Sequence, residues 1–281
     1  MTTTTSTCSS GLNEYGLAAY KMLDERAARE VAFILDIGGI NIVTGKTLGE
    51  DFDLAQLRRD YDAVFIGLGH NAVNALGIDN EAADGVHNAV DFIELIRQVD
   101  LSTLPVGRQV VVIGGGNTAI DIAVQIKKLG AESVTMVYRR GLDEMGATEY
   151  EQQVAQTNGV LIRTQARPHR ILTRDDQLSA VEFEYTENDA SGQLTGTGEI
   201  FALPADQLFK AIGQALDTTP LNGDETPEQS QSRIKVNECQ RTSLPDVWAG
   251  GDCTAGKDLT VTAVQDGKIA AININETLNH G

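Results

Sequence analysis

A glycine-rich turn lies between a run of β-branched residues and a helical pattern, and its residue types and spacing suit a phosphate-bearing ligand. Val110–Ile113 is a run of β-branched residues, which is typical of a fully buried strand. Gly114, Gly116 and Ala119 follow with G-x-G-x-x-A spacing, which lets a pyrophosphate approach the backbone and lets a helix pack on the strand. The N–H groups at the start of that helix favour phosphate. The sequence therefore predicts a dinucleotide site.

The end of the next predicted strand, 133–138, indicates which dinucleotide binds. A site for NADH usually has Asp or Glu there, which binds the ribose 2′-hydroxyl. This chain has Arg139 and Arg140, whose guanidinium groups favour a 2′-phosphate and so favour NADPH. NADH stays open, because the acidic residue is only a tendency of such sites. The candidate residues for this cofactor are Gly114, Gly115, Gly116, Asn117, Thr118, Ala119, Asp121, Arg139, Arg140 and Gly213.

A second turn with a carboxylate lies near the C-terminus. A predicted strand over 247–249 runs into Gly250, Gly251 and Asp252, and a helical pattern starts at Leu259. Such a turn facing a helix N-terminus suits a flavin, because the Asp can accept hydrogen bonds from ribityl hydroxyls and the helix can stabilise negative charge on the reduced ring. The alternative is that Asp252 only caps the last helix. The candidates here are Gly251, Asp252, Thr260, Val261 and Thr262.

Predicted strands and helices alternate along the chain around these residues, which predicts an α/β fold. Buried strands are predicted over 62–69, 160–163 and 208–213, and helices over 91–99 and 148–157. Alternating patterns over 170–174, 178–185 and 200–203 predict an antiparallel excursion of two or three strands.

Composition limits the class of protein. The 281 residues have 41% hydrophobic and 22% charged residues, which suits a globular chain with a core. The net charge of -18 argues against nucleic acid and anionic membrane as partners. No apolar run of about 18 residues occurs, so we expect no membrane span.

The cysteines and histidines predict neither a metal site nor a catalytic side chain. The cysteines are far apart and form no C-x-x-C pair, which argues against a redox-active disulfide and a metal cluster and favours a reducing, cytoplasmic location. The histidines lack metal spacing. These residues are Cys8, Cys239 and Cys253, and His70, His87, His169 and His280.

Four blocks together resemble one family. They are GLNEYGLAAYK at 11–21, the glycine fingerprint at 114–119, Tyr-Arg-Arg at 138–140 with Met145, and AGGD at 249–252 with LTVTAVQDGK at 259–268. The chain resembles the flavin-dependent pyridine-nucleotide oxidoreductases. The branch that it most resembles holds the electron-input subunits of bacterial NAD-dependent dihydropyrimidine dehydrogenases, and the small subunits of glutamate synthase are similar.

This resemblance implies two Rossmann-like dinucleotide-binding domains, with the NAD(P)H domain inserted into an incomplete FAD domain. The expected divisions are a polar tail at 1–10, FAD-binding segments at 11–100 and 245–281, and the NAD(P)H domain at 101–244. Gly11 and Leu12 then join the residues expected to bind FAD. The family's first G-x-G-x-x-G does not appear in this sequence, so we expect the FAD site to be incomplete here.

The resemblance also implies a function. Electrons would pass from NAD(P)H through FAD to a catalytic partner subunit carrying FMN and iron–sulfur clusters, for the interconversion of uracil and its dihydro form. The alternatives are an NAD(P)H-binding module without a competent FAD site, and an electron donor like the small subunit of glutamate synthase. An uncovered apolar face would also favour self-association into a homo-oligomer.

Overall fold

The computed structural model describes residues 18, 21, 24–70, 72–221, 223, 225–256 and 258–280. The chain divides into two compact units. Unit 1 consists mainly of 31–72 and 214–280, and unit 2 mainly of 73–213. The predicted domain boundaries, after Asp100 and before Pro245, differ from these crossings. The difference arises because β3 (Val86–Asn88) pairs with β10 (Gln207–Lys210), which places the segment before Asp100 in the sheet of unit 2.

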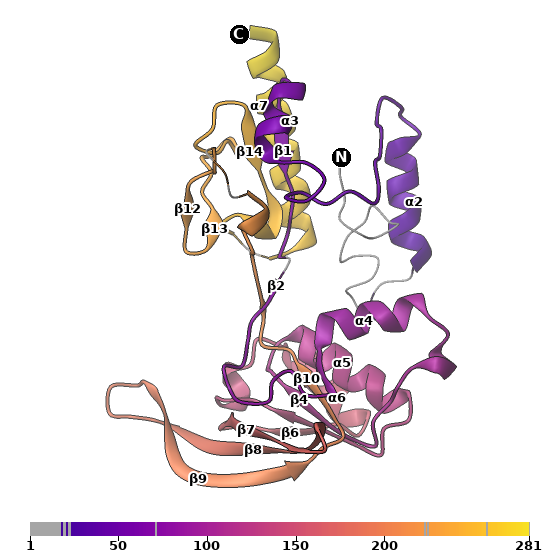
Figure 1. Ribbon diagram of the computed structural model, residues 1–281, viewed down its shortest axis with the longest axis vertical. Coiled ribbons are helices and arrows are strands. Elements are labelled where there is room, and N and C mark those ends of the chain that lie inside the picture. The colour runs from indigo at the N-terminus through magenta and orange to yellow at the C-terminus, as the bar shows by residue number, and fades with distance from the viewer. Residues whose placement is uncertain are drawn as a thin grey trace. The chain divides into compact units, whose positions relative to one another are not determined.

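Unit 2 is built on a five-stranded parallel sheet in the order β3-β10-β4-β5-β6. Helices α4, α5 and α6 lie on one face of this sheet, and the antiparallel sheet β7-β8-β9 lies on the other (Figure 1). The remaining elements of unit 2 are α4 (Ala89–Gln98), η1 (Leu101–Thr103), β4 (Gln109–Ile113), α5 (Asn117–Lys128), β5 (Ser133–Val137), η2 (Leu142–Glu144), α6 (Glu149–Thr157), β6 (Leu161–Arg163), β7 (Ala166–Arg174), β8 (Gln177–Asn188) and β9 (Leu194–Pro204).

Strand β4 shows why a run of β-branched residues forms the centre of this unit. Val110 and Val112 pack into the core under the helices, whereas Val111 and Ile113 pack into the core shared with β7 and β8. Because successive side chains point to opposite faces, a strand covered on both faces is apolar at every position. The predicted strand, helix, second strand and antiparallel excursion are all confirmed.

Helix α5 follows β4 across the glycine turn and is buried at every position from Ala119 to Ile126. Two lysines in its last turn face the negative end of the helix dipole, which stabilises that end. Gly130 ends the helix with a φ of 114°, a backbone conformation that glycine adopts without a Cβ clash.

Unit 1 contains a two-stranded parallel sheet, β1 (Val64–Ile66) with β14 (Val247–Ala249). Its core joins both strands to Leu54, Leu221 and Ile234. The helices α2 and α7 and the short elements complete it: α2 (Asp24–Leu35), which runs from unit 2 into unit 1, α3 (Leu54–Asp60), η3 (Thr219–Leu221), β12 (Gln229–Ser230), β13 (Arg233–Ile234), η4 (Gly251–Cys253) and α7 (Thr260–His280). The chain passes between the units at β2 (Ala72–Val73) and at β11 (Gln214–Ala215).

Candidate nucleotide-binding site

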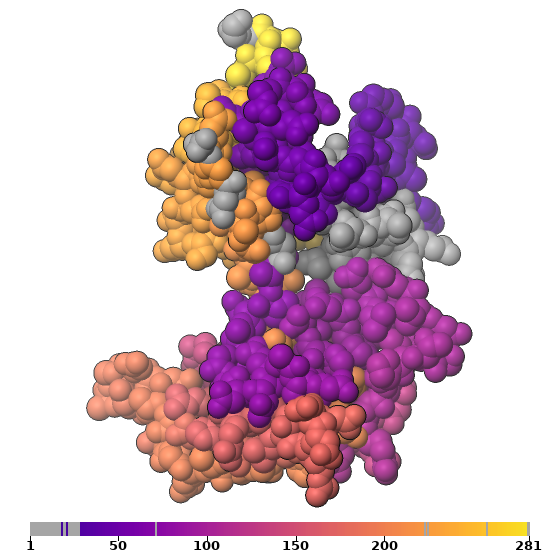
Figure 2. All heavy atoms as spheres, in the orientation of Figure 1, coloured from indigo at the N-terminus to yellow at the C-terminus, as the bar shows by residue number. Residues whose placement is uncertain are grey.

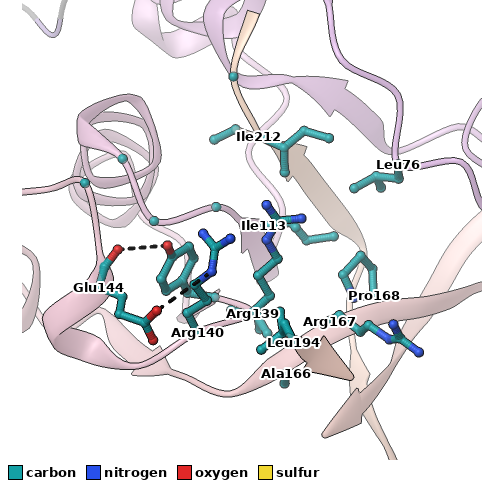
Figure 3. A pocket seen from close by; sticks show the side chains of 18 of the residues that line it. Leu76, Ile113, Arg139, Arg140, Glu144, Ala166, Arg167, Pro168, Leu194 and Ile212 are labelled. Carbon is teal, nitrogen blue, oxygen red and sulfur yellow. Dashed lines mark hydrogen bonds and ion pairs between the residues drawn. The ribbon is translucent and has the colours of Figure 1, made fainter. Parts of the chain in front are cut away.

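A cavity of about 1060 Å³ lies in unit 2 at the carboxyl ends of β4, β5 and β10 (Figure 3). Its walls also include the segment 74–76, the start of β7 and the tip of the β8–β9 hairpin. Ligands of open α/β sheets bind at the carboxyl ends of the strands, where the connecting loops separate. The cavity therefore lies where the fold predicts a ligand.

Glycine stands at positions 114, 115 and 116 of the turn for different physical reasons. Gly114 has a φ of 149°, and a Cβ there would collide with the carbonyl oxygen of Ala211. A Cβ on Gly115 would lie 2.5 Å from the ring of Tyr138. A Cβ on Gly116 would meet no protein atom within 4 Å, and its φ is ordinary. The first two glycines are thus required by the fold, whereas the third leaves room for a ligand.

Gly116 is also the N-cap of α5, and a glycine has no side chain with which to cap that helix end. Backbone donors at an N-terminus with the positive end of the helix dipole bind phosphate groups. The turn is held by hydrogen bonds from Gly114 N–H to the Val137 carbonyl (3.1 Å) and from Ala147 N–H to the Gly115 carbonyl (3.0 Å). These two hydrogen bonds join the glycine turn to β5 and to the segment before α6.

Three arginines line the cavity, and their ionic partners differ. Arg167 is held by Glu184, with Nη2 to Oε2 at 2.6 Å. Arg140 is 3.8 Å from Glu144, a longer ion pair between partly exposed side chains. Arg139 is exposed, and the described part of the chain gives its guanidinium no carboxylate partner. Arg139 is therefore the cation most available for an anionic ligand.

The Glu184 carboxylate shows how firmly Arg167 is held. Its pKa lies below its ordinary value, first because of the hydrogen bond from Arg167 and then because the Gly198 N–H donates to it. A Cβ on Gly196 would collide with this carboxylate, so a larger residue on β9 would displace the Glu184 side chain. Arg167 thus lines the cavity, but its positive charge is already paired with the Glu184 carboxylate.

The segment 74–76 is fixed to the cavity by one carboxylate. Glu81 accepts hydrogen bonds from the N–H groups of Leu76 (2.9 Å) and Gly77 (3.1 Å) and pairs with Lys210 Nζ at 2.7 Å. Burial alone would raise the pKa of Glu81, but Lys210 and the two N–H groups outweigh it, and the pKa is lowered. This wall is thus tied to the end of β10.

The residues predicted from the fingerprint do not all face the cavity. Gly114, Gly115, Gly116, Arg139, Arg140 and Gly213 line it. Asn117, Thr118 and Ala119 belong to the first turn of α5 but are not among the lining residues. Asp121 is buried, 2% exposed, and pairs with Lys21 at 2.6 Å.

The second predicted group lies in unit 1. Gly251, with a φ of 75°, donates its N–H to Asp266 Oδ2 at 3.0 Å, which ties the turn after β14 to α7. Burial, and then the nearby Asp258, raise the pKa of Asp252. Thr260, Val261 and Thr262 form the first turn of α7, and Val261 is exposed. Gly11 and Leu12 lie outside the described residues.

Two further observations on the described residues concern metals and thiols. The described residues include no group of three or more side chains that could hold a metal ion, and no helix long and apolar enough to cross a membrane. Cys239 and Cys253 are both free thiols. Cys253 is buried, which raises its pKa. Its thiol donates a hydrogen bond to the Gly250 carbonyl oxygen at 3.3 Å and so helps to hold the turn after β14.

The model of the pyridine nucleotide-disulphide oxidoreductase family matches residues 5–267. The chain belongs to this family. The membership confirms the resemblance predicted from the sequence, and it makes this chain a member of an oxidoreductase family named for its use of pyridine nucleotides.

Curated relatives are about one third identical. The glutamate synthase [NADPH] small chain of Escherichia coli is 32% identical, with 94% of this chain and 60% of the relative covered. The NAD-dependent dihydropyrimidine dehydrogenase subunit PreT of Salmonella typhimurium is also 32% identical (95% and 60%). The beta subunit of an NADP(+)-dependent formate dehydrogenase of Moorella thermoacetica is 32% identical (96% and 39%). The chain thus spans about two fifths to three fifths of these relatives, and identity does not separate them.

Solved structures confirm the fold. FprA of Mycobacterium tuberculosis in complex with NADPH gives a TM-score of 0.73 at 19% identity, covering 96% of this chain and 75% of that chain. Thioredoxin reductase of Lactococcus lactis gives 0.74 at 19% identity, covering 100% and 91%. The predicted α/β fold of the dinucleotide-binding kind is therefore confirmed.

Several lining residues were not expected from the sequence. Arg167 could have been found, because it follows β6 and the carboxyl ends of parallel strands meet at one edge. The hairpin tip carried no such signal, since polar residues at a turn are ordinary. These additional lining residues include Asn74, Leu76, Arg167, Asn188, Gln193 and Leu194.

Proposed function

We propose that unit 2 binds NADPH and that the chain passes electrons from it through FAD to a partner subunit. The observation that carries the proposal is Arg139, an exposed guanidinium lining the cavity beside Gly116, whose missing Cβ leaves room for a ligand. A 2′-phosphate is the part of NADPH that NADH lacks, and Arg is the side chain best suited to bind it. NADH remains the alternative cofactor.

The chain's own residues bind and orient in this proposal, and they perform no acid–base chemistry. The N-terminus of α5 holds the pyrophosphate, Arg139 binds the 2′-phosphate, and Gly116 leaves room for the backbone approach. When bound, NADPH would supply a hydride and FAD would accept it. Positioning is what such a transfer requires from the protein.

The residues of unit 1 fit part of an FAD site. Asp252 is a partly buried carboxylate, and burial and then the nearby Asp258 raise its pKa. Ribityl hydroxyls would donate hydrogen bonds to this carboxylate. The first turn of α7, with Thr260 and Thr262, would place the positive end of a helix dipole near the flavin ring. We propose Gly251, Asp252 and this turn as the flavin-binding residues of the chain.

The partner and the final acceptor follow from the relatives' names only as a proposal. Relatives are described as a small chain or as subunits, which supports a catalytic partner for this chain. We propose a partner carrying FMN and iron–sulfur clusters, with a dihydropyrimidine or uracil as the end substrate. A donor role like that of the glutamate synthase small chain is the alternative and has equal support from identity.

Flavin content tests the electron-transfer part of the proposal. The purified chain should contain FAD, and its visible absorption should bleach when NADPH is added. Asp252→Asn should lower the amount of FAD bound per chain, whereas Asp258→Asn should lower it less. A colourless chain that still binds NADPH would replace this proposal with that of a nucleotide-binding module.

Binding titrations test the nucleotide part. Arg139→Ala should weaken NADPH by about ten- to a hundredfold and NADH far less, because a charge-assisted hydrogen bond is lost only with the 2′-phosphate. Arg108→Ala is the matched control, since Arg108 is an exposed cation of unit 2 paired with Glu132 and not a lining residue. Equal losses of NADPH and NADH in Arg139→Ala would refute the assignment of Arg139.

A further inference from the structure

The tip of the β8–β9 hairpin forms a wall of the cavity although it lies outside the parallel sheet. Asn188, Gln193 and Leu194 are among the lining residues, together with Arg139. Figure 2 shows this hairpin standing out from the surface of unit 2, and Figure 3 shows Leu194 close to Arg139 in the view of the cavity. The hairpin therefore reaches the end of the cavity where the arginines lie.

The hairpin tip has a fixed shape. The Asp189 carboxylate accepts hydrogen bonds from Ser191 N–H (2.8 Å), Ser191 Oγ (2.6 Å) and Gln193 N–H (2.9 Å). The Asp189 N–H in turn donates to the Gln193 carbonyl at 2.9 Å. An Asp that bonds its own turn in this way restricts the turn to one conformation. The lining residues beside it are held in place before any ligand binds.

One buried hydroxyl connects the hairpin to Arg139. Thr186 on β8 is 4% exposed, and its Oγ1 donates to the backbone carbonyl of Arg139 at 2.7 Å. Its N–H donates to the Gln165 carbonyl at 2.9 Å. The β8–β9 register shifts between Glu184, which pairs with Ile200, and Thr186, which pairs with Gly196, so the regular ladder is interrupted beside Thr186. Thr186 and Asn188 are two residues apart on a strand, so they share a face.

We propose that the β8–β9 hairpin is the specificity element of the cavity, with Thr186 as the positioning residue for Arg139. Thr186 fixes the backbone from which the Arg139 guanidinium extends, and Leu194 forms the wall that faces the same end of the ligand. The ligand class is a nucleotide bearing a 2′-phosphate on its adenosine. The inference rests on the proposed function, which assigns the 2′-phosphate to Arg139.

The experiment compares two probes that differ only in the 2′-phosphate, adenosine 2′,5′-bisphosphate and adenosine 5′-monophosphate, by calorimetric titration of the full chain. The dissociation constant of the monophosphate divided by that of the bisphosphate measures 2′-phosphate recognition. A general loss of structure would weaken both probes alike and leave this ratio unchanged. Thr186→Val should reduce this ratio about three- to tenfold, the effect of one buried hydrogen bond. Thr186→Ser, which keeps the hydroxyl, should restore the ratio.

Thr195→Val is the matched control. Thr195 lies on the same hairpin, and its hydroxyl donates to the Glu187 carbonyl at 3.3 Å and not to Arg139. Its ratio should equal that of the unaltered chain. An unchanged ratio in Thr186→Val would overturn the positioning role. A wild-type chain that binds both probes equally would refute the proposed function of Arg139 and the inference with it.

Leu194→Ala gives a second test that does not depend on the folding of Thr186→Val. Leu194 is partly exposed in the cavity wall, so truncation should leave the fold intact. Both probes should bind about three- to tenfold more weakly, because apolar contact with the adenosine end is lost. Unchanged affinity for both probes would overturn the role of the hairpin as a wall.

Discussion

Units 1 and 2 each place a glycine turn between a parallel strand and a helix, but they bury very different amounts of apolar surface. Helix α5 of unit 2 lies over a five-stranded sheet and is buried from Ala119 to Ile126. Helix α7 of unit 1 adjoins a two-stranded sheet and leaves Val261 and Val264 exposed. Phe33 and Ile37 of unit 1 are 72% and 75% exposed. The same strand–turn–helix motif thus buries its helix fully over the five-stranded sheet of unit 2 and only partly beside the two-stranded sheet of unit 1.

The glycines of unit 2 provide the largest expected effect. Gly114→Ala should destabilise unit 2 by about 3 kcal/mol or more, because its Cβ collides with backbone and its φ is positive. Gly116→Ala should change the free energy of unfolding by no more than about 1 kcal/mol and should weaken NADPH binding about tenfold. Far-UV circular dichroism in denaturant measures the first effect and nucleotide titration the second. Similar stability losses in both variants would remove the distinction between the two glycines.

Unit 1 should be the source of any self-association, because its exposed apolar side chains gain from mutual burial. Replacing Phe33 and Ile37 together with serine should weaken association about tenfold or more in sedimentation experiments. Serine at Tyr150 and Leu161, two exposed apolar positions of unit 2, is the matched control and should change little. A monodisperse monomer before any substitution would contradict the prediction.

An ion pair in unit 1 should have a moderate effect that depends on pH. Arg58 Nε lies 2.9 Å from both carboxylate oxygens of Asp246, and this hydrogen bond keeps the pKa of Asp246 below its ordinary value. A depressed pKa contributes stability that is present above the unfolded value, about 3.9, and is lost as pH falls through the folded value. Asp246→Asn should therefore cost about 1–2 kcal/mol at neutral pH and almost nothing in strong acid.

Trp248 makes this measurement specific to unit 1, because it is the chain's single tryptophan and lies buried on β14. Its fluorescence in denaturant follows unit 1 alone. Glu228→Gln is the control, since the Glu228–Lys235 pair is solvent-exposed in the same unit and should contribute less than about 0.5 kcal/mol. A cost for Asp246→Asn that is the same at all pH values would show that the charge is not its source.

The smallest effect concerns His87 in unit 2. Its ring contacts Phe92 and Phe209, and burial lowers its pKa although the nearby Asp84 opposes this. The unfolded chain then takes up a proton more readily, so stability should fall by less than about 1 kcal/mol as pH drops below about 6.5. His87→Gln should flatten this slope in circular dichroism, and His169→Gln, at an exposed position, should not. A slope that persists in His87→Gln would assign it to other groups.

Local patterns were enough for β4, α5 and β5 of unit 2 and for six of the residues that line its cavity. The β-branched run of β4, the glycine turn and Arg139 act through backbone geometry and charge within a short stretch of chain, so residue types alone predicted them. The predicted places of Asn117, Thr118 and Asp121 at the cofactor stay predictions, and Asp121 is buried against Lys21.

The tertiary structure decided which distant segments surround those residues. The pairing of β3 with β10 joins the segment from 73 to 100 to unit 2. Thr186 of β8 donates to the Arg139 carbonyl, and the tip of the β8–β9 hairpin lines the cavity. Neither contact leaves a mark in the sequence, because a strand partner or a carbonyl acceptor can be supplied by any residue type. Residue types determined which ligand chemistry the chain can offer, and long-range packing determined which segments form the walls of the cavity in unit 2.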